Sequence, residues 1–201
     1  NHDAQREGHW KAKDFEKEVA QFTGAKHALA VSSGSTAVNT MLAACGVGYG
    51  DEVIVPPFTY IATIEAVLLA GALPVFAEID DTLCMSAEGI RTVLSPKTKA
   101  ILLVHMCGAA ADLDGIIAIC KEKNIQLIED SAQALGASYK GKMLGTFGLM
   151  GSFSYDFFKI NTCGEGGIVI TDDHELWDTA QQFADHGHDH IGNNRGMEQH
   201  P

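Results

Sequence analysis

The sequence predicts an α/β fold with a mainly parallel sheet and helices on both of its faces. Short apolar runs, many of them rich in β-branched residues, alternate along the chain with segments of helical period. The apolar runs show little polar alternation, which indicates strands that are buried on both faces. No internal repeat, linker or low-complexity tract interrupts the pattern, so residues 1–201 are expected to form one domain.

The expected elements follow one another from residue 27 onward. Strands are predicted at 27–32, 51–56, 73–79, 99–105, 125–130, 151–155 and 166–171. Helices are predicted at 35–46, 60–70, 86–94, 113–124 and 175–184. Ser86, with Glu88 nearby, is a typical helix start, because a serine side chain can cap the first free amides. After Ala137 the pattern changes to short pieces separated by glycine.

The composition disfavours several classes of protein. The 26 acidic and 14 basic side chains give a net charge of −12, which is unsuited to a nucleic-acid or anionic-membrane surface. The five cysteines form no CxxC pair, so neither a zinc site nor a disulfide framework is expected, and a reducing cytoplasm is the natural compartment. No apolar run approaches the roughly 18 residues that a membrane span needs. The first residues are polar and lack an initiator Met, so the natural start is expected to lie upstream or to have been trimmed.

A candidate anion site follows the first predicted strand, since ligands of parallel sheets bind beyond the carboxyl ends of the strands. The segment SSGST, residues 32–36, opens a helix there. Gly34 permits a tight turn, and Ser35 and Thr36 add hydroxyls beside free helix amides, an arrangement that suits a phosphate. Serine and glycine are also ordinary capping residues, so both interpretations stay open. The segment lacks the glycine patterns of dinucleotide folds and of P-loops.

Other strands lead into further chemically useful side chains. Asp130 ends the strand 125–130, with Gln133 three residues later. A carboxylate there can cap a helix, or it can keep the ring nitrogen of a ligand protonated. His105 ends the strand 99–105, and Tyr60 offers a flat stacking surface after the strand 51–56. Each of these residues alone could also belong to the core or to a loop.

Lys159 lies between an aromatic run and a glycine-rich turn, in the segment GSFSYDFFKINTCGEGG, residues 151–167. Either its stem follows apolar surface and its ammonium reaches water, or its surroundings hold it as a reactive amine. A phosphate cradle, an acid for a pyridinium, an aromatic plate and a lysine are together the contacts that pyridoxal phosphate needs. The combination therefore favours the reactive amine.

In these segments the chain resembles the DegT-type sugar aminotransferases, which are fold-type I pyridoxal-phosphate enzymes. The matching segments keep the order of that family and cover nearly all of residues 15–187. They are FEKEVAQFTGAKHALAVSSGSTAV, GDEVIVPPFTYIAT, GALPVFAEID, HMCG, EDSAQALGASYKGKMLGTFG and GSFSYDFFKINTCGEGGIVIT. The resemblance implies the three-layer α/β/α large domain of the family, without its small C-terminal domain after Pro201. It also implies a homodimer.

The resemblance gives a role to each residue around the cofactor ring. Lys159 would form the Schiff base with pyridoxal phosphate and carry the proton between the amino donor and the cofactor. Asp130 would pair with the pyridine nitrogen, and Gln133 would reach the phenolic oxygen. Tyr60 would stack on the ring. The resemblance further implies that the lysine lies in a dry site flanked by aromatic side chains.

The phosphate contacts are implied in the same way. Ser154 would join Gly34 and Ser35 on the phosphate. The family commonly has SGT where this chain has SGST, so the choice between the hydroxyls of Ser35 and Thr36 stays open. Gly164–Gly167 would form a tight turn beside the lysine, where the backbone passes close to a ligand.

Two segments depart from the family pattern. SYDFFK, residues 154–159, is more acidic and aromatic than usual, which points to an unusual sugar acceptor. DHGHDH, residues 185–190, has three alternating histidines that could be metal ligands. Because no cysteine or carboxylate cluster accompanies them, a loop facing the substrate is favoured and no metal is expected.

The function implied is a pyridoxal-phosphate aminotransferase of amino-sugar biosynthesis, with an amino-acid donor and a small-molecule keto-sugar acceptor. Glutamate is the expected donor, with glutamine as the alternative. The acceptor stays open between a nucleotide-linked keto-hexose, a keto-octulosonate and a cyclitol ketone.

Two other hypotheses remain. One is a sugar dehydratase of the same fold, in which histidine replaces the lysine, so that Lys159 argues against it. The other is a shortened, non-catalytic binding or assembly module.

Overall fold

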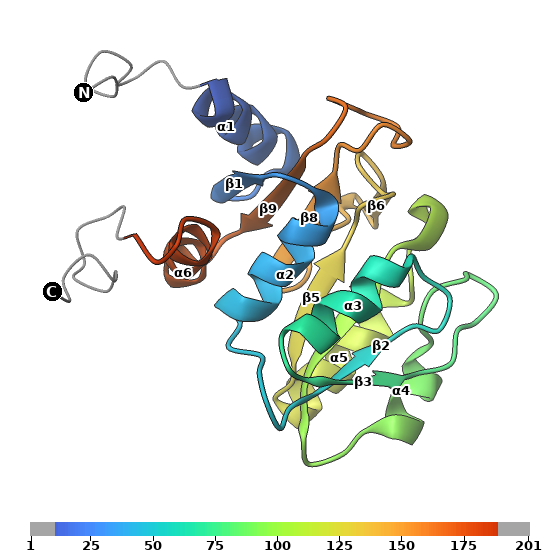
Figure 1. Cartoon of the computed structure of the whole chain (residues 1–201). Coiled ribbons are helices and arrows are strands. Elements are labelled where there is room, and N and C mark those ends of the chain that lie inside the picture. The colour runs from blue at the N-terminus through green and yellow to red at the C-terminus, as the bar shows by residue number, and fades with distance from the viewer. Residues whose placement is uncertain (1–10, 189–201) are drawn as a thin grey trace, which may run out of the picture.

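A seven-stranded sheet forms the centre of the computed structural model, which describes residues 11–188 (Figure 1). Its strands are, in spatial order, β1 (His27–Val31), β9 (Gly167–Thr171), β8 (Met150–Ser154), β5 (Gln126–Asp130), β4 (Thr98–Val104), β2 (Glu52–Val55) and β3 (Leu73–Phe76). β9 runs antiparallel to its neighbours β1 and β8, and the other adjacent strands are parallel. β6 (Ser138–Tyr139) and β7 (Lys142–Met143) form a separate two-stranded sheet. The predicted α/β fold with a mainly parallel sheet is confirmed.

Helices cover both faces of this sheet, which gives three layers. They are α1 (Lys11–Thr23), α2 (Gly34–Ala44), α3 (Ile61–Leu69), α4 (Ala87–Val93), α5 (Leu113–Lys123), α6 (His174–Ala184) and the short 3₁₀ helix η1 (Met106–Gly108). On β9, Val169 packs into the core shared by α2, α3 and α6. Its neighbours Ile168 and Ile170 pack with Val19 of α1 instead. Successive strand residues point to opposite faces, so α1 lies across the sheet from α2 and α6.

The side chains that cap the helices explain where the helices begin. Ser33 accepts a hydrogen bond from the amide of Thr36 at the start of α2, and Ser86 accepts one from the amide of Gly89 at the start of α4. Asp112 caps α5 and Asp173 caps α6 in the same way. Each cap satisfies an amide that has no partner inside the helix. The helix start expected at Ser86 is confirmed.

Two features differ from the sequence-based expectation. α1 was not predicted, although its sequence places Phe15 and Val19 one turn apart and both contribute to a core cluster. The predicted burial on both faces is wrong for β3, where Leu73 is 58% exposed and Phe76 is 49% exposed. β3 is the last strand of the sheet and pairs with β2 alone, so the layers of helices do not cover it completely.

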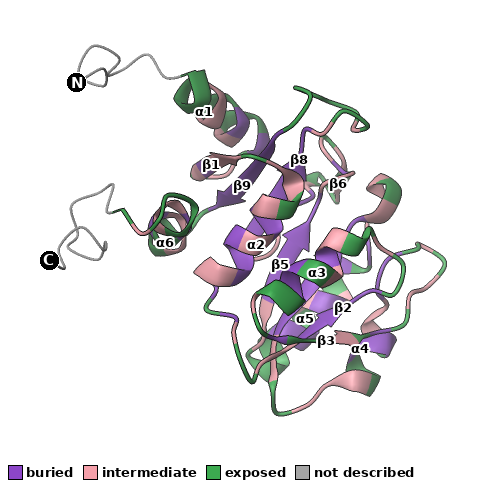
Figure 2. Ribbon diagram, viewed as in Figure 1, coloured by how far each residue is buried: buried purple, intermediate pink, exposed green. Residues whose placement is uncertain are grey.

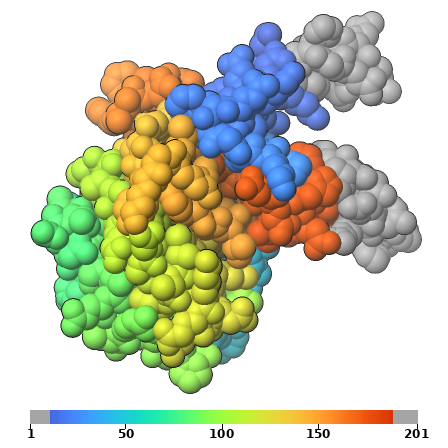
Figure 3. Space-filling model, turned by 180° about the vertical axis from the view of Figure 1, so that it is seen from behind, coloured from blue at the N-terminus to red at the C-terminus, as the bar shows by residue number. Residues whose placement is uncertain are grey.

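Burial is greatest in the middle of the sheet, as Figure 2 shows for β5, β8 and β9. Every residue of β8 and β9 is buried. Figure 3 shows that the middle of the chain, coloured green to gold, forms a large part of the face opposite to that of Figure 1. Here α4, α5 and the segment 134–147 pack into a second core cluster. In the described part of the chain no helix has the length and apolar character that crossing a membrane requires.

Candidate active site

The register of the sheet brings several strand ends to one edge. Val104 at the end of β4 pairs with Asp130 at the end of β5, and Asp130 pairs with Ser152 near the end of β8. β1 and β8 are both antiparallel to β9, so β1 also ends at this edge, and α2 begins there. The edge therefore collects the residues that the sequence placed at strand ends.

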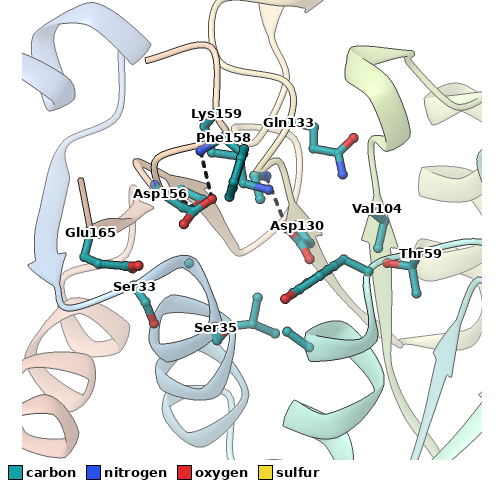
Figure 4. Close-up of a pocket in the computed structure, with 16 residues that line it drawn as sticks. Ser33, Ser35, Thr59, Val104, Asp130, Gln133, Asp156, Phe158, Lys159 and Glu165 are labelled. Carbon is teal, nitrogen blue, oxygen red and sulfur yellow. Dashed lines mark hydrogen bonds between the residues drawn. The ribbon is translucent and has the colours of Figure 1, made fainter. Parts of the chain in front are cut away.

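A cavity of about 420 Å³ opens at this edge, and Figure 4 shows side chains converging on it from α2, α3, β5 and the loop after β8. The predicted site residues that line it are Gly34, Ser35, Tyr60, Asp130, Gln133, Ser154 and Lys159. Thr36 is not among the lining residues, and its hydroxyl contacts the hydroxyls of Ser32 and Ser33. His105 does not line the cavity either.

One wall of the cavity is built from the start of α2 and the end of β8. The Ser33 hydroxyl accepts a hydrogen bond from the amide of Thr36. The amides of Gly34 and Ser35, at the start of the same helix, can therefore donate to a ligand. A Cβ on Gly34 would lie only 2.7 Å from Cβ of Ser154, so only glycine lets these two segments approach so closely. The Ser154 hydroxyl accepts the amide of Asp156 at 3.3 Å and keeps its own proton for donation. The wall therefore presents amides and hydroxyls that can hold an anion.

Asp130 forms the acidic part of the cavity. Its side chain is buried and accepts hydrogen bonds from the Thr63 hydroxyl at 2.9 Å and from the amide of Ala132 at 3.1 Å. Burial raises the pKa of the Asp130 carboxyl, while these two hydrogen bonds and the positive charges of Lys159 and His105 act against the rise. A buried carboxylate of this kind is well placed to pair with a cationic group of a ligand.

Gln133 has a fixed orientation in the cavity. Its Oε1 accepts the amide of Cys107 at 2.9 Å. Cys107 has a positive φ of 55° inside η1, an uncommon conformation that is part of the turn presenting this amide. Because the oxygen of the Gln133 side chain is taken, its NH₂ group is the donor that remains for a ligand. That is the group needed to reach a phenolic oxygen.

Lys159 lies in the loop between β8 and β9. Its amide donates to the carbonyl of Asp156 at 3.0 Å, and its Nζ lies 5.8 Å from the centre of the Tyr60 ring. The aromatic side chains of Tyr60 and Phe158 line the cavity together with Lys159, as expected. The expected dryness is wrong for this chain, because Phe157 is 69% exposed and Phe158 is 88% exposed. Tyr155 still packs into the core, but Phe157 and Phe158 lie in the turn that follows, where their side chains are exposed.

The glycine-rich turn lies beside the lysine, as expected. Asp156 forms an isolated bridge with Gly164, which joins the lysine loop to the Gly164–Gly167 turn. Gly164 has a φ of 92°, a conformation that favours glycine. Glu165, within this turn, also lines the cavity together with Asp156.

Sequence reasoning did not single out Thr63, Thr59 or Glu129. Thr63 binds Asp130, and its hydroxyl lies 2.9 Å from that of Thr59. Thr59 lies just before α3 and Thr63 lies in its first turn. The contact between their hydroxyls depends on how the chain enters the helix, so no pattern in the sequence pointed to it. Glu129 precedes Asp130 in the sequence, but its partners lie elsewhere in the chain.

Glu129 and His105 form a fully buried pair on the face of β5 opposite Asp130. Nε2 of His105 lies 2.9 Å from Oε1 of Glu129, and both side chains are 0% exposed. Glu129 also accepts three backbone amides, those of Gly145, Phe147 and Gly148. Burial lowers the pKa of His105, but its interactions with Cys84 and Glu129 outweigh burial and raise that pKa to about 9.

This pair predicts a pH dependence of stability. The pKa of His105 is about 9 in the folded chain, above the roughly 6.5 of an unfolded histidine. The stabilisation is therefore complete below about pH 6.5 and is lost as the pH rises through about 9, by on the order of a few kcal/mol. Urea unfolding at a series of pH values in this window measures the effect. His105→Gln should remove most of this slope, and an unchanged slope in that variant would contradict the assignment.

No group of three or more His, Cys, Asp or Glu side chains within residues 11–188 could hold a metal ion. The histidine-rich segment 185–190 is described only as far as His188, where the His186 and His188 rings lie 6.5 Å apart. Residues 189 and 190 lie outside the described part. The interpretation of this segment as a substrate-facing loop stays a prediction.

Residues 3–200 match the model of the DegT/DnrJ/EryC1/StrS aminotransferase family. The chain belongs to this family. The resemblance inferred from the sequence is thereby confirmed, and members of this family depend on pyridoxal phosphate.

Curated relatives include a UDP-N-acetyl-3-dehydro-alpha-D-glucosamine 3-aminotransferase of Acidithiobacillus ferrooxidans, 42% identical over 92% of this chain and 52% of the relative. A GDP-perosamine synthase of Escherichia coli O157:H7 is 41% identical over 91% of this chain and 53% of the relative. This member of the DegT/DnrJ/EryC1/StrS family thus spans about half the length of the curated relatives it matches.

Solved structures agree with the family assignment. An aminotransferase from Psychrobacter cryohalolentis superimposes with a TM-score of 0.88 at 43% identity, over 89% of this chain and 46% of that one. NtdA from Bacillus subtilis, solved with bound cofactor PMP, gives a TM-score of 0.84 at 32% identity, over 92% of this chain and 42% of NtdA. The family fold is therefore shared with structures determined by crystallography.

Proposed function

We propose that this chain is the cofactor-binding large domain of a pyridoxal-phosphate-dependent sugar aminotransferase. The observation that carries the proposal is a single cavity that contains a buried carboxylate, a lysine amine and a helix start with free amides. Few ligands need all of these groups together. Pyridoxal phosphate does, because it combines a phosphate, a basic ring nitrogen and an aldehyde.

The residues of the cavity fit this cofactor. The volume of about 420 Å³ is in the usual range for small-molecule sites. The amides of Gly34 and Ser35 and the hydroxyls of Ser35 and Ser154 would hold the phosphate. Gly34 and Ser154 approach so closely that a Cβ on Gly34 would lie 2.7 Å from Cβ of Ser154. This approach brings both sides of the cradle together.

The other end of the cavity suits the ring. Asp130 would accept a hydrogen bond from the protonated ring nitrogen, and the oriented NH₂ group of Gln133 would donate one to the phenolic oxygen. Tyr60 would lie against the ring face, and its own ring lies 5.8 Å from Nζ of Lys159. The cofactor supplies an aldehyde that exchanges amines and a ring that withdraws electrons. Lys159 would bind the aldehyde and, as a neutral amine, move a proton to and from the α-carbon of the donor.

The reaction proposed is amino transfer from glutamate, or glutamine, to a keto-sugar. The donor is oxidised to its 2-oxo acid and the sugar ketone is reduced to an amine, so no outside oxidant or reductant is needed. Relatives named as a sugar 3-aminotransferase and as perosamine synthases support a nucleotide-linked keto-hexose as the acceptor.

We also propose that two copies of the chain form a homodimer.

Transfer of an isotope label tests this function directly. The chain is incubated with pyridoxal phosphate, nitrogen-labelled glutamate and a nucleotide-linked keto-hexose, and the sugar is analysed by mass spectrometry. Label in the sugar amine together with 2-oxoglutarate supports the proposal. Cofactor binding without transfer from either labelled glutamate or labelled glutamine, to keto-sugars of any of the classes considered above, would show a binding module rather than an aminotransferase.

The phosphate cradle makes a separate prediction. Ser35→Ala and Ser154→Ala should each weaken binding of pyridoxal phosphate about tenfold or more, because a hydrogen bond to a charged group contributes roughly 1.5–3 kcal/mol. Fluorescence titration of the apo form measures the affinity. Ser86→Ala is a matched control, since it removes a capping hydroxyl of α4 outside the cavity and should lower stability by about 1 kcal/mol with unchanged affinity. Wild-type affinity in both cavity variants would place the phosphate elsewhere.

A further inference from the structure

Glu129 and His105 lie behind the cavity, on the opposite face of the sheet. Val104 and Asp130 are register partners on β4 and β5, and both line the cavity. His105 and Glu129 are their neighbours in the sequence, so their side chains point to the other face. The main chain connects the two faces, because the amide of His105 donates to the backbone carbonyl of Asp130 at 3.1 Å.

The hydrogen bonds of Glu129 allow a buried charge to persist here. Oε1 accepts from Gly145 at 2.8 Å and contacts Nε2 of His105 at 2.9 Å, and Oε2 accepts from Phe147 and Gly148, each at 2.6 Å. With three amides and an imidazole, the carboxylate is satisfied without water. Such an acceptor favours the doubly protonated, cationic imidazole. The other titratable group against the His105 ring is Cys84.

Asp130, in contrast to Glu129, is in a site where burial disfavours its negative charge. The hydrogen bonds from Ala132 and Thr63 oppose this effect most strongly. Two cations add to them, Lys159 from the cavity and His105 from behind the sheet. Lys159 must be a neutral amine whenever it acts as a base, so its charge is absent at that stage of the proposed reaction. His105 does not act as a base in the proposed reaction, so its imidazolium keeps its positive charge.

We propose that His105 and Glu129 are positioning residues that keep Asp130 as a carboxylate, ready to accept a hydrogen bond from the protonated ring nitrogen of the cofactor. The inference rests on the proposed function, because the charge on Asp130 matters only to a ligand with a protonated ring nitrogen. Neither residue touches the cavity, so both act through Asp130.

A pair of ligands tests the proposal without an activity assay. One is pyridoxal phosphate, and the other is its analogue with carbon in place of the ring nitrogen. Glu129→Gln keeps the shape of the side chain, and His105→Gln keeps a hydrogen-bond donor, but each removes a charge. Dissociation constants for both ligands are measured in the wild-type chain and in each variant. Both variants should lower the preference for pyridoxal phosphate over the analogue by about tenfold or more.

Two further variants calibrate this result. Asp130→Asn should lose the preference as well. Asp178→Asn should keep it, because Asp178 is a buried carboxylate of α6 that binds Gln182 outside the cavity. Equal weakening of both ligands in the two Gln variants would show a purely structural role and overturn the proposal. Loss of cooperative unfolding in both Gln variants, with Asp178→Asn intact, would overturn it in the same way.

The failure of the proposed function has a different signature. If the wild-type chain binds neither ligand, the function falls and this inference falls with it. If the wild-type chain prefers pyridoxal phosphate and the Gln variants keep that preference, the function stands and only the role of His105 and Glu129 is rejected.

Discussion

Lys159→Ala will abolish covalent attachment of pyridoxal phosphate while leaving non-covalent binding in place. The reason is that the ε-nitrogen forms the bond to the cofactor, whereas Asp130 and the start of α2 hold the ring and the phosphate. After borohydride reduction and proteolysis, mass spectrometry should find the pyridoxyl group on the wild-type peptide that contains Lys159. The variant should carry no such group. Its amino-transfer rate should fall to background, because the amine that moves the proton is gone.

Exposed lysines serve as controls for this experiment. Lys140 pairs with Asp114, and Lys142 lies 4.8 Å from the centre of the Phe147 ring. Lys140→Ala and Lys142→Ala should keep the label on Lys159 and should change stability by less than about 1 kcal/mol. A pyridoxyl group on either of these lysines in the wild-type chain would defeat the assignment of Lys159.

Asp130→Asn should lower amino transfer by orders of magnitude while the chain stays folded. An asparagine cannot hold the proton on the ring nitrogen, so the ring would lose the charge partner that makes it withdraw electrons. In a buried site this loss corresponds to a few kcal/mol of transition-state stabilisation. Steady-state rates are compared at saturating cofactor, together with thermal unfolding of both forms. Near-normal rates in a folded, cofactor-loaded Asp130→Asn variant would reject this role.

The sequence predicted those site residues that lie at the ends of strands. Asp130 closes a strand and Ser35 follows one across a short turn. The two strands run in the same direction, so both residues lie at one edge of the sheet. The sequence also predicted the glycine turn beside Lys159, since few residues other than glycine adopt the backbone conformation found at Gly164. These predictions depend on local pattern and on the direction of the strands.

The remaining features depend on contacts between distant parts of the chain. The environment of Glu129 is set by amides of residues 145–148 and by the ring of His105, none of which the segment around Glu129 specifies. Whether Phe157 and Phe158 are covered depends on what packs over their loop, and apolarity by itself cannot tell. The exposure of β3 depends on its place at the end of the sheet, which becomes known only with the strand order.

The pairing of β1 with β9 has a consequence for the order in which the chain acquires its structure. His27 pairs with Thr171, so β1 must wait for nearly the whole described chain to be synthesised before it can enter the sheet. The strands β2 to β5, in contrast, find their partners among segments made shortly before them or after them. Because α2 follows β1, its place against Ser154 also depends on this late pairing. On the ribosome, the half of the cavity that contains Asp130 can therefore form before the half that would bind phosphate.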